Sequence, residues 1–198
     1  MSKIKFCGIQ PTTDLPFINQ LAPDYIGMVF AQNSRRFVTI AQARQINEIL
    51  NPSIKKVGVF VNAPEELIRQ IVAEKLIDFI QLHGQEDELT IQHYQMTFHL
   101  PIIKAFSIQT PQDVLEASQS TADYLLFDYQ QAGSGQSFDW RLIQQVNRPY
   151  FLAGGIKPEN LKAALAFKPY AIDLSSGIES NGVKNNQKMQ TIMKIMRG

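Results

Sequence analysis

The stretch YFLAGGIKPENLKAALAF, residues 150–167, contains one complete copy of the pattern that decides the fold. Its first part, 150–154, is a short apolar run that ends in glycine, as is typical of a buried parallel strand. Its second part, 157–167, has the apolar spacing of an amphipathic helix. A strand that leads through a tight turn into a helix is the repeating unit of an α/β protein.

The same unit recurs along the whole chain. The apolar runs are short, rich in Ile, Val, Leu, Phe and Tyr, and apolar nearly throughout, which favours parallel strands buried on both faces. These predicted strands are 4–9, 25–30, 57–61, 79–82, 101–106, 124–128, 150–154 and 171–175. Helices are predicted at 39–50, 64–76, 110–119, 157–167 and 186–198, with weaker patterns at 14–22, at 86–97 and after Phe138.

Eight strand–helix units predict a compact α/β protein, a single (β/α)8 or TIM barrel over residues 1–198. About 25 residues per unit leave no room for a second domain. A doubly wound parallel sheet is the alternative architecture, and the number of strands favours the barrel.

The composition excludes several classes of protein. The chain is 44% hydrophobic and 19% charged with a net charge of +1 and no basic run, so we expect no nucleic-acid partner and no anionic membrane surface. No apolar run approaches the roughly 18 residues of a membrane span. One cysteine cannot form an internal disulfide, and the opening MSKIKFCGIQPTTD lacks a signal-peptide core, so we expect a cytoplasmic protein.

The carboxyl ends of barrel strands, with the loops that follow them, carry the chemistry of this fold. The seventh predicted strand ends at Gly154 and Gly155, and the eighth ends at DLSSG, 173–177. Small residues there let backbone amides approach an anion, and these two loops are the usual phosphate site of the fold. We therefore expect a phosphorylated small-molecule substrate, although glycines after strands mostly form turns.

Cys7 and Asp128 end the first and sixth predicted strands. A lone cysteine is usually a small buried hydrophobic residue, and as a general base it would need a positive or dipolar neighbour to become a thiolate. A carboxyl group at a partly desolvated barrel mouth can stay protonated and act as a general acid. A structural pairing or a helix cap is the alternative interpretation of Asp128.

Two further side chains are candidates for the site. Arg36, with Arg35, lies in the loop after the second strand, where a guanidinium can hold a carboxylate at two points. The alternative is a solvated surface arginine. His83 ends the fourth strand and is more often a hydrogen-bonded structural residue than a catalyst.

Seven motifs, in order, carry a resemblance over nearly the whole chain: KFCGI, NSRRFV, VGVFVN, IQLHGQE, GSGQSFDW, LAGGIKPEN and DLSSGIESNGVKN. Each is modest alone, but together they make the chain resemble the phosphoribosylanthranilate isomerases of tryptophan biosynthesis. The resemblance implies an Amadori rearrangement of N-(5-phosphoribosyl)anthranilate, with Cys7 as general base and Asp128 as general acid. It implies that no metal and no cofactor are required.

The resemblance also implies roles in substrate binding. Arg36 aligns with the arginine that holds the anthranilate carboxylate, whereas His83 and Asp173 align with positions that line the pocket. Gly133 and Gly135 would shape a loop over the substrate. The phosphate loops align with Gly154, Gly155, Ser175, Ser176 and Gly177.

The chain departs from the family pattern at a few positions. Arg35 stands where the family often has proline, and Asn185 removes a negative charge near the start of the last helix. The other departures are Gln10, Ser134 and Asn181. None of them removes a proposed catalytic group.

Alternatives remain open at this point. The histidine-pathway aminoaldose isomerase performs the same rearrangement, but its first strand resembles one with aspartate in place of Cys7. Indole-glycerol phosphate synthase relies on catalytic lysines, and here only Lys104 comes close. A non-catalytic barrel that binds a sugar phosphate is the third alternative. We expect a monomer or a homodimer.

Overall fold

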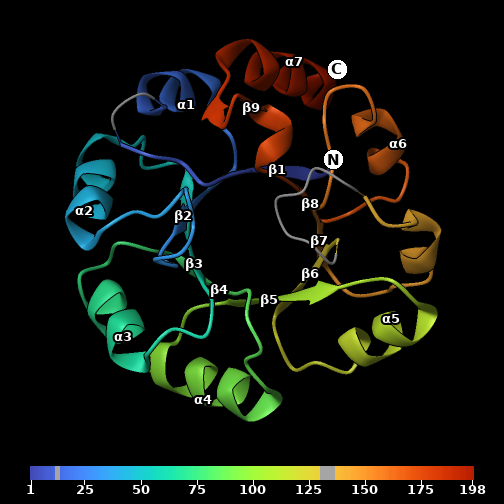
Figure 1. Cartoon of the computed structure of the whole chain (residues 1–198), viewed down its shortest axis with the longest axis horizontal. Coiled ribbons are helices and arrows are strands. Elements are labelled where there is room, and N and C mark those ends of the chain that lie inside the picture. Colours follow the sequence, from blue (N-terminus) through green and yellow to red (C-terminus); the bar gives the residue numbers. More distant parts are fainter. Residues whose placement is uncertain (12–13, 130–136) are drawn as a thin grey trace.

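The computed structural model describes residues 1–11, 14–129 and 137–198, and it contains a closed barrel of parallel strands. The strands pair in sequence order from β1 to β8, and β8 closes on β1. Helices surround the barrel in a ring (Figure 1). The predicted (β/α)8 fold is therefore confirmed, and the doubly wound sheet is excluded.

The barrel strands agree with the predicted runs to within two residues at almost every boundary. They are β1 (Lys3–Cys7), β2 (Tyr25–Val29), β3 (Lys55–Phe60), β4 (Phe79–Leu82), β5 (Ile102–Ser107), β6 (Tyr124–Asp128), β7 (Tyr150–Leu152) and β8 (Ala171–Leu174). A short antiparallel pair, which the sequence did not indicate, follows β8 and consists of β9 (Glu179–Ser180) and β10 (Val183–Lys184).

The helices lie on the outside of the barrel. They are α1 (Leu15–Leu21), α2 (Ile40–Ile49), α3 (Glu65–Ala73), α4 (Glu88–Phe98), α5 (Pro111–Ser118), α6 (Leu161–Leu165) and α7 (Asn186–Arg197), with 3₁₀ turns η1 (Trp140–Ile143) and η2 (Ser176–Ile178). Among the described residues, no helix is both long enough and apolar enough to span a membrane.

Two predicted helices are shorter than expected. The pattern after Phe138 forms only the 3₁₀ turn η1, and α6 begins at Leu161 rather than at Lys157. The Asn160 side chain accepts a hydrogen bond from the Lys157 N–H at 2.8 Å. A short polar side chain that bonds nearby backbone in this way favours a turn over a helix.

The last helix has a clear local cause for its start. The side chain of Asn185 accepts a hydrogen bond from the Lys188 N–H at 3.0 Å and so caps α7. Asparagine is as good an N-cap as aspartate. Asn185, which departs from the family pattern, therefore keeps the cap and removes only the negative charge.

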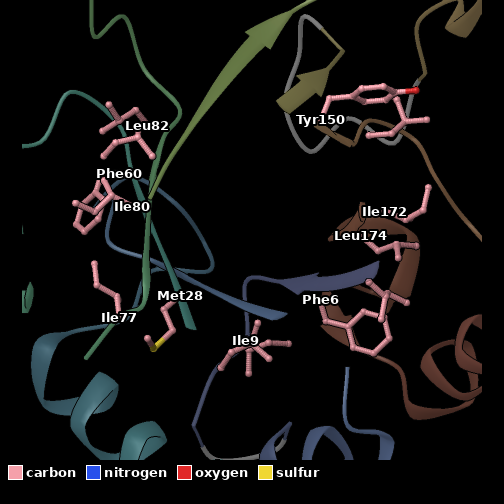
Figure 2. Packing of buried hydrophobic residues seen from close by; sticks show 14 of the residues in the cluster. Phe6, Ile9, Met28, Phe60, Ile77, Ile80, Leu82, Tyr150, Ile172 and Leu174 are labelled. Atoms are coloured by element: carbon pink, nitrogen blue, oxygen red, sulfur yellow. The ribbon is translucent and has the colours of Figure 1, made fainter. Parts of the chain in front are cut away.

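The core has two layers, one on each side of the strands. Outward side chains pack against the helices, and Figure 2 shows Phe6 of β1 beside Leu174 of β8, its register partner. Inward side chains fill the barrel itself, as in other barrels of this class. The inner set is Cys7, Tyr25, Val29, Val57, Val59, Ile103, Leu126, Phe151, Ala153 and Ala171.

Candidate active site

The carboxyl ends of the strands bring the main candidates to one end of the barrel. Cys7 is the last residue of β1 and Asp128 the last of β6, while His83 directly follows β4. Arg36 lies in the loop between β2 and α2. Parallel strands in a closed barrel end at the same rim, so the topology gathers these side chains around one mouth.

The thiol of Cys7 lies in a desolvated position. The residue is 9% exposed, and its register partner on β2 is Gly27. A Cβ at position 27 would lie 2.7 Å from the Cys7 Sγ, so only glycine leaves room for the sulfur. Burial raises the pKa of the Cys7 thiol, while the positive charges of Lys5 and Lys184 act against that shift.

Below the thiol lies a buried ion pair. The Lys5 side chain is 0% exposed, and its Nζ donates to the Asp173 Oδ2 at 2.8 Å. Burial lowers the pKa of Lys5, but the charges of Asp173 and Cys7 outweigh it, so the pKa lies above its ordinary value. The other oxygen, Asp173 Oδ1, is buried and has no hydrogen-bond partner among the described residues, so it can still accept one.

On the β6 side of the mouth, Asp128 lies close to His83. The Asp128 Oδ1 accepts a hydrogen bond from the Tyr129 N–H at 2.7 Å, and Oδ2 lies 3.5 Å from the His83 Nε2. The Gln81 amide lies 2.9 Å from the His83 Nδ1. With that amide as donor, the histidine carries its proton on Nε2, on the side of the carboxylate.

Gly154, which follows the β7 strand, packs directly against this carboxylate. Its φ is +78°, and a Cβ there would lie 2.9 Å from the Asp128 Oδ1. Both the left-handed backbone and the missing side chain are therefore needed at this position. The resemblance assigns Gly154 to a phosphate loop, and the structure shows that this residue also borders Asp128.

Around Glu179 lies a group of charges that we call the rim cluster, consisting of Arg35, Arg36, Glu179 and Lys184. The Glu179 carboxylate accepts from the Arg35 Nη2 at 2.6 Å, from the Arg36 Nε and Nη2 at 2.6 and 2.9 Å, and from the Lys184 Nζ at 2.8 Å. Burial acts against the charge on Glu179, but Arg36 and Lys184 hold the pKa of its carboxyl below its ordinary value. Three cations thus share one carboxylate.

Arg36 keeps one edge of its guanidinium for another partner. Glu179 uses Nε and one hydrogen of Nη2, and the side chain is 15% exposed. Among the described residues no acceptor binds Nη1. The opposite edge, formed by Nη1 and the second Nη2 hydrogen, has the fork geometry that binds a carboxylate at two points.

The loops after β7 and β8 enclose a separate pocket of about 180 Å³. Gly177 contacts the opposite loop so closely that a Cβ there would collide with the Ile156 carbonyl oxygen. Lys188 of α7 adds a cation to the wall. The lining residues are Gly155, Lys157, Pro158, Glu159, Ser176, Gly177 and Lys188.

The remaining predicted residues fall in different places. Ser175 does not line this pocket; its hydroxyl donates to the Cys7 carbonyl oxygen at 3.2 Å. Gly133 and Gly135, predicted to shape a loop over the substrate, lie outside the described residues, as does Ser134. Within the described residues, no group of three or more His, Cys, Asp or Glu side chains could hold a metal ion.

Sequence reasoning did not single out Lys5, Glu179, Lys184 or Lys188. Lys5 had a usable signal, because it stands two residues before Cys7 and strand residues two apart share a face. The contacts of Glu179 and Lys184 had none, because they depend on the β9–β10 hairpin, which no local pattern indicated.

A closed parallel barrel, with a thiol and a carboxylate at its strand ends and a pocket between the loops after β7 and β8, is typical of an enzyme of the (β/α)8 class. The family model of N-(5'phosphoribosyl)anthranilate (PRA) isomerase matches residues 4–195 of this chain. The chain therefore belongs to this family, and it is an isomerase of tryptophan biosynthesis.

Individual relatives agree over their full lengths. The chain is 39% identical to N-(5'-phosphoribosyl)anthranilate isomerase of Endomicrobium trichonymphae, covering 100% of this chain and 99% of the relative. It is 37% identical to that of Streptococcus mutans, covering 100% of both. The solved structure of the Thermus thermophilus isomerase is 35% identical over 98% of both chains, with a TM-score of 0.90.

Another solved structure is informative because it contains a ligand. It is a phosphoribosyl anthranilate isomerase in complex with reduced 1-(o-carboxyphenylamino)-1-deoxyribulose 5-phosphate, 30% identical over 100% of both chains with a TM-score of 0.87.

Proposed function

We propose that this chain converts N-(5-phosphoribosyl)anthranilate to 1-(2-carboxyphenylamino)-1-deoxy-D-ribulose 5-phosphate, with Cys7 as general base and Asp128 as general acid. The observation that carries the proposal is the position of the two groups, because each ends a barrel strand at the mouth. The complex of a relative with a reduced form of this product supports the choice of substrate.

The reaction is an internal rearrangement in which each proton has a donor and an acceptor. Asp128 gives a proton to the ring oxygen of the ribose while the nitrogen lone pair forms the C1=N bond, so the ring opens to a cationic imine. The Cys7 thiolate then takes the proton from C2, and the C–H electrons form the C1=C2 bond as the nitrogen regains its lone pair. The resulting enol-amine gains a proton at C1 and loses one from the C2 hydroxyl to give the ketone.

The surrounding residues have binding roles in this proposal. The phosphate occupies the pocket beside Gly155, Ser176 and Gly177, where backbone amides and Lys188 favour an anion. The anthranilate carboxylate binds the open edge of Arg36. The unpartnered Asp173 Oδ1 accepts a hydrogen bond from a substrate hydroxyl or amine.

The other predicted residues complete the site. His83 orients the carboxyl group of Asp128 through its Nε2, Gly154 keeps space beside that group, and Ser175 holds the Cys7 backbone. Gly133 and Gly135 would shape the loop that covers the substrate.

We further propose that the enzyme works in the cytoplasm as a monomer or homodimer. A solved structure of mutually generated monomers of the dimeric Thermotoga maritima isomerase, 30% identical to this chain, supports considering both oligomeric states.

Turnover of freshly prepared substrate, followed by the loss of anthranilate fluorescence, tests the function. We expect wild-type turnover and a loss of about 10²–10⁴-fold in kcat for each of the folded variants Cys7→Ala and Asp128→Ala. No turnover by folded wild-type protein would overturn the assignment, and the histidine-pathway aminoaldose would be the next substrate to assay. Full activity in either variant would remove that residue from the catalytic pair.

A further inference from the structure

Lys5 is a fully buried lysine that the proposed reaction does not use. It stands two residues before Cys7 on β1, so both side chains point into the barrel, on the opposite side from Phe6. Its register partner across the sheet is Asp173 of β8, and the two side chains form the ion pair described above. Burying a lysine costs free energy unless its charge is paired, so the carboxylate of Asp173 is needed to hold Lys5 at this position.

The ammonium group and the thiol border the same small space. A Cβ at position 27 would lie 2.7 Å from the Cys7 Sγ and 3.2 Å from the Lys5 Nζ. The positive charge of Lys5 lowers the pKa of the Cys7 thiol, whereas burial and the charge of Asp173 raise it. Nζ has three hydrogens, so it can serve the Asp173 Oδ2 and the sulfur together.

Three charged groups act on the thiol from the elements around it. Lys5 comes from β1, Asp173 from β8 and Lys184 from β10. The Lys184 Nζ is committed to Glu179 at 2.8 Å and to the Ser175 carbonyl oxygen at 3.1 Å. Of the two cations, Lys5 is the one whose Nζ borders the same space as the sulfur, beside Gly27.

We propose that Lys5, held in place by Asp173, stabilises the thiolate form of Cys7 and is therefore a functional residue of the isomerase. This inference rests on the proposed role of Cys7 as the general base. A thiolate at this buried position loses its hydration, and the ammonium hydrogen bond replaces part of it. When Cys7 takes the C2 proton, Lys5 keeps its charge paired with Asp173.

The thiol can be observed directly, because Cys7 is the only cysteine of the chain. The experiment measures the rate of iodoacetamide alkylation against pH, together with the ultraviolet absorbance of the thiolate, for wild type and Lys5→Met. Lys5→Arg tests rescue by a conserved charge. Lys104→Met is the matched control, since Lys104 is another buried barrel lysine paired with a carboxylate, Glu86, at 2.9 Å.

In Lys5→Met we expect the ionisation midpoint of the thiol to rise by about 1–3 pH units, because an adjacent opposite charge favours the ionised form by that amount. We expect partial recovery in Lys5→Arg and no shift in Lys104→Met. If Lys5→Met fails to fold, the midpoint is compared between Asp173→Asn and the double variant Lys5→Met with Asp173→Asn, because Asp173 itself raises the pKa of the thiol; we expect the higher midpoint in the double variant. An unchanged midpoint in the folded variant would overturn the inference.

Kinetics separates this inference from the proposed function. We expect Lys5→Met to lower kcat at neutral pH more than it raises KM, and the activity to recover partly as the pH rises. If Lys5→Met shifts the ionisation midpoint of the thiol but the wild-type protein has no turnover, the pairing of Lys5 with the thiol stands and the isomerase role is removed. If turnover depends on Cys7 but Lys5→Met leaves the ionisation midpoint unchanged, the isomerase role stands and the inference about Lys5 fails.

Discussion

Two groups of charged side chains at the mouth of the barrel differ in net charge and in burial. Under Cys7, one cation faces one carboxylate, Lys5 with Asp173, and their side chains are 0% and 7% exposed. In the rim cluster three cations share Glu179, and exposure ranges from 3% for Lys184 to 57% for Arg35. The inner pair is dry and neutral, whereas the rim cluster is partly solvated and has two positive charges in excess.

The difference indicates what each group does for the substrate. If Cys7 ionises, the inner group becomes negative by one charge, which suits the cationic imine of the proposed reaction. The excess positive charge at the rim suits the anthranilate carboxylate. A negative charge beside the imine and a positive charge beside the neighbouring carboxylate would together fix the orientation of the anthranilate end of the substrate.

The largest effect on stability is expected from the inner pair. Asp173→Ala leaves the Lys5 ammonium buried without its carboxylate, and removing one partner of a buried pair typically costs about 3–5 kcal/mol. The measurement is the free energy of unfolding in urea. A loss no greater than that caused by a rim substitution would show that burial does not distinguish the two groups.

Substrate binding should depend on the rim. In Arg36→Lys a single ammonium replaces the fork, so it cannot bind Glu179 and the substrate carboxylate together. Hydrogen bonds to charged groups contribute about 1.5–3 kcal/mol, so we expect KM to rise about 10- to 100-fold with a smaller change in kcat. Arg44→Lys, in an exposed pair with Glu74, is the control. A fall in kcat at constant KM would contradict a binding role.

Acid should weaken the rim cluster as Glu179 becomes protonated. The pKa of Glu179 in the folded protein lies below its ordinary value of 4.5 because Arg36 and Lys184 donate to it, although burial opposes them. Its contribution to stability is therefore present above pH 4.5 and is lost as the pH falls through the lowered folded value. We expect Glu179→Gln to remove this part of the acid-induced loss in urea unfolding measured against pH. An exposed control, Glu48→Gln, should keep the wild-type slope.

The smallest effect is expected at Arg35. Its ion pair with Glu179 is more than half exposed on the arginine side, and exposed pairs contribute about 0–1 kcal/mol. Arg35→Ala should therefore change the free energy of unfolding by less than about 1 kcal/mol and leave KM nearly unchanged. A large rise in KM would mean that this guanidinium, rather than Arg36, holds the substrate.

Part of the site could be predicted from local pattern alone. The apolar runs located the strands, and a barrel places every strand end at one mouth, so Cys7, Asp128 and His83 were predicted together. The loops after β7 and β8 were likewise expected to form a phosphate site, and residues of both loops line a pocket there whose ligand stays a prediction. The length of α6 was not predicted, because the Asn160 side chain accepts from the Lys157 N–H and donates to the Gly155 carbonyl oxygen, and so holds a turn where the helical pattern begins.

The sequence by itself determined the eight-fold alternation of strand and helix, the chemistry available at the strand ends and the family. Only the tertiary structure decided which charges are partners. Lys5 and Asp173 are separated by 168 positions, and Arg36 and Glu179 by 143. Hydrophobic periodicity is a local property of the chain and can be read from it, whereas ion pairs of this kind form only when the barrel closes β8 on β1 and the hairpin after β8 folds over the loop after β2.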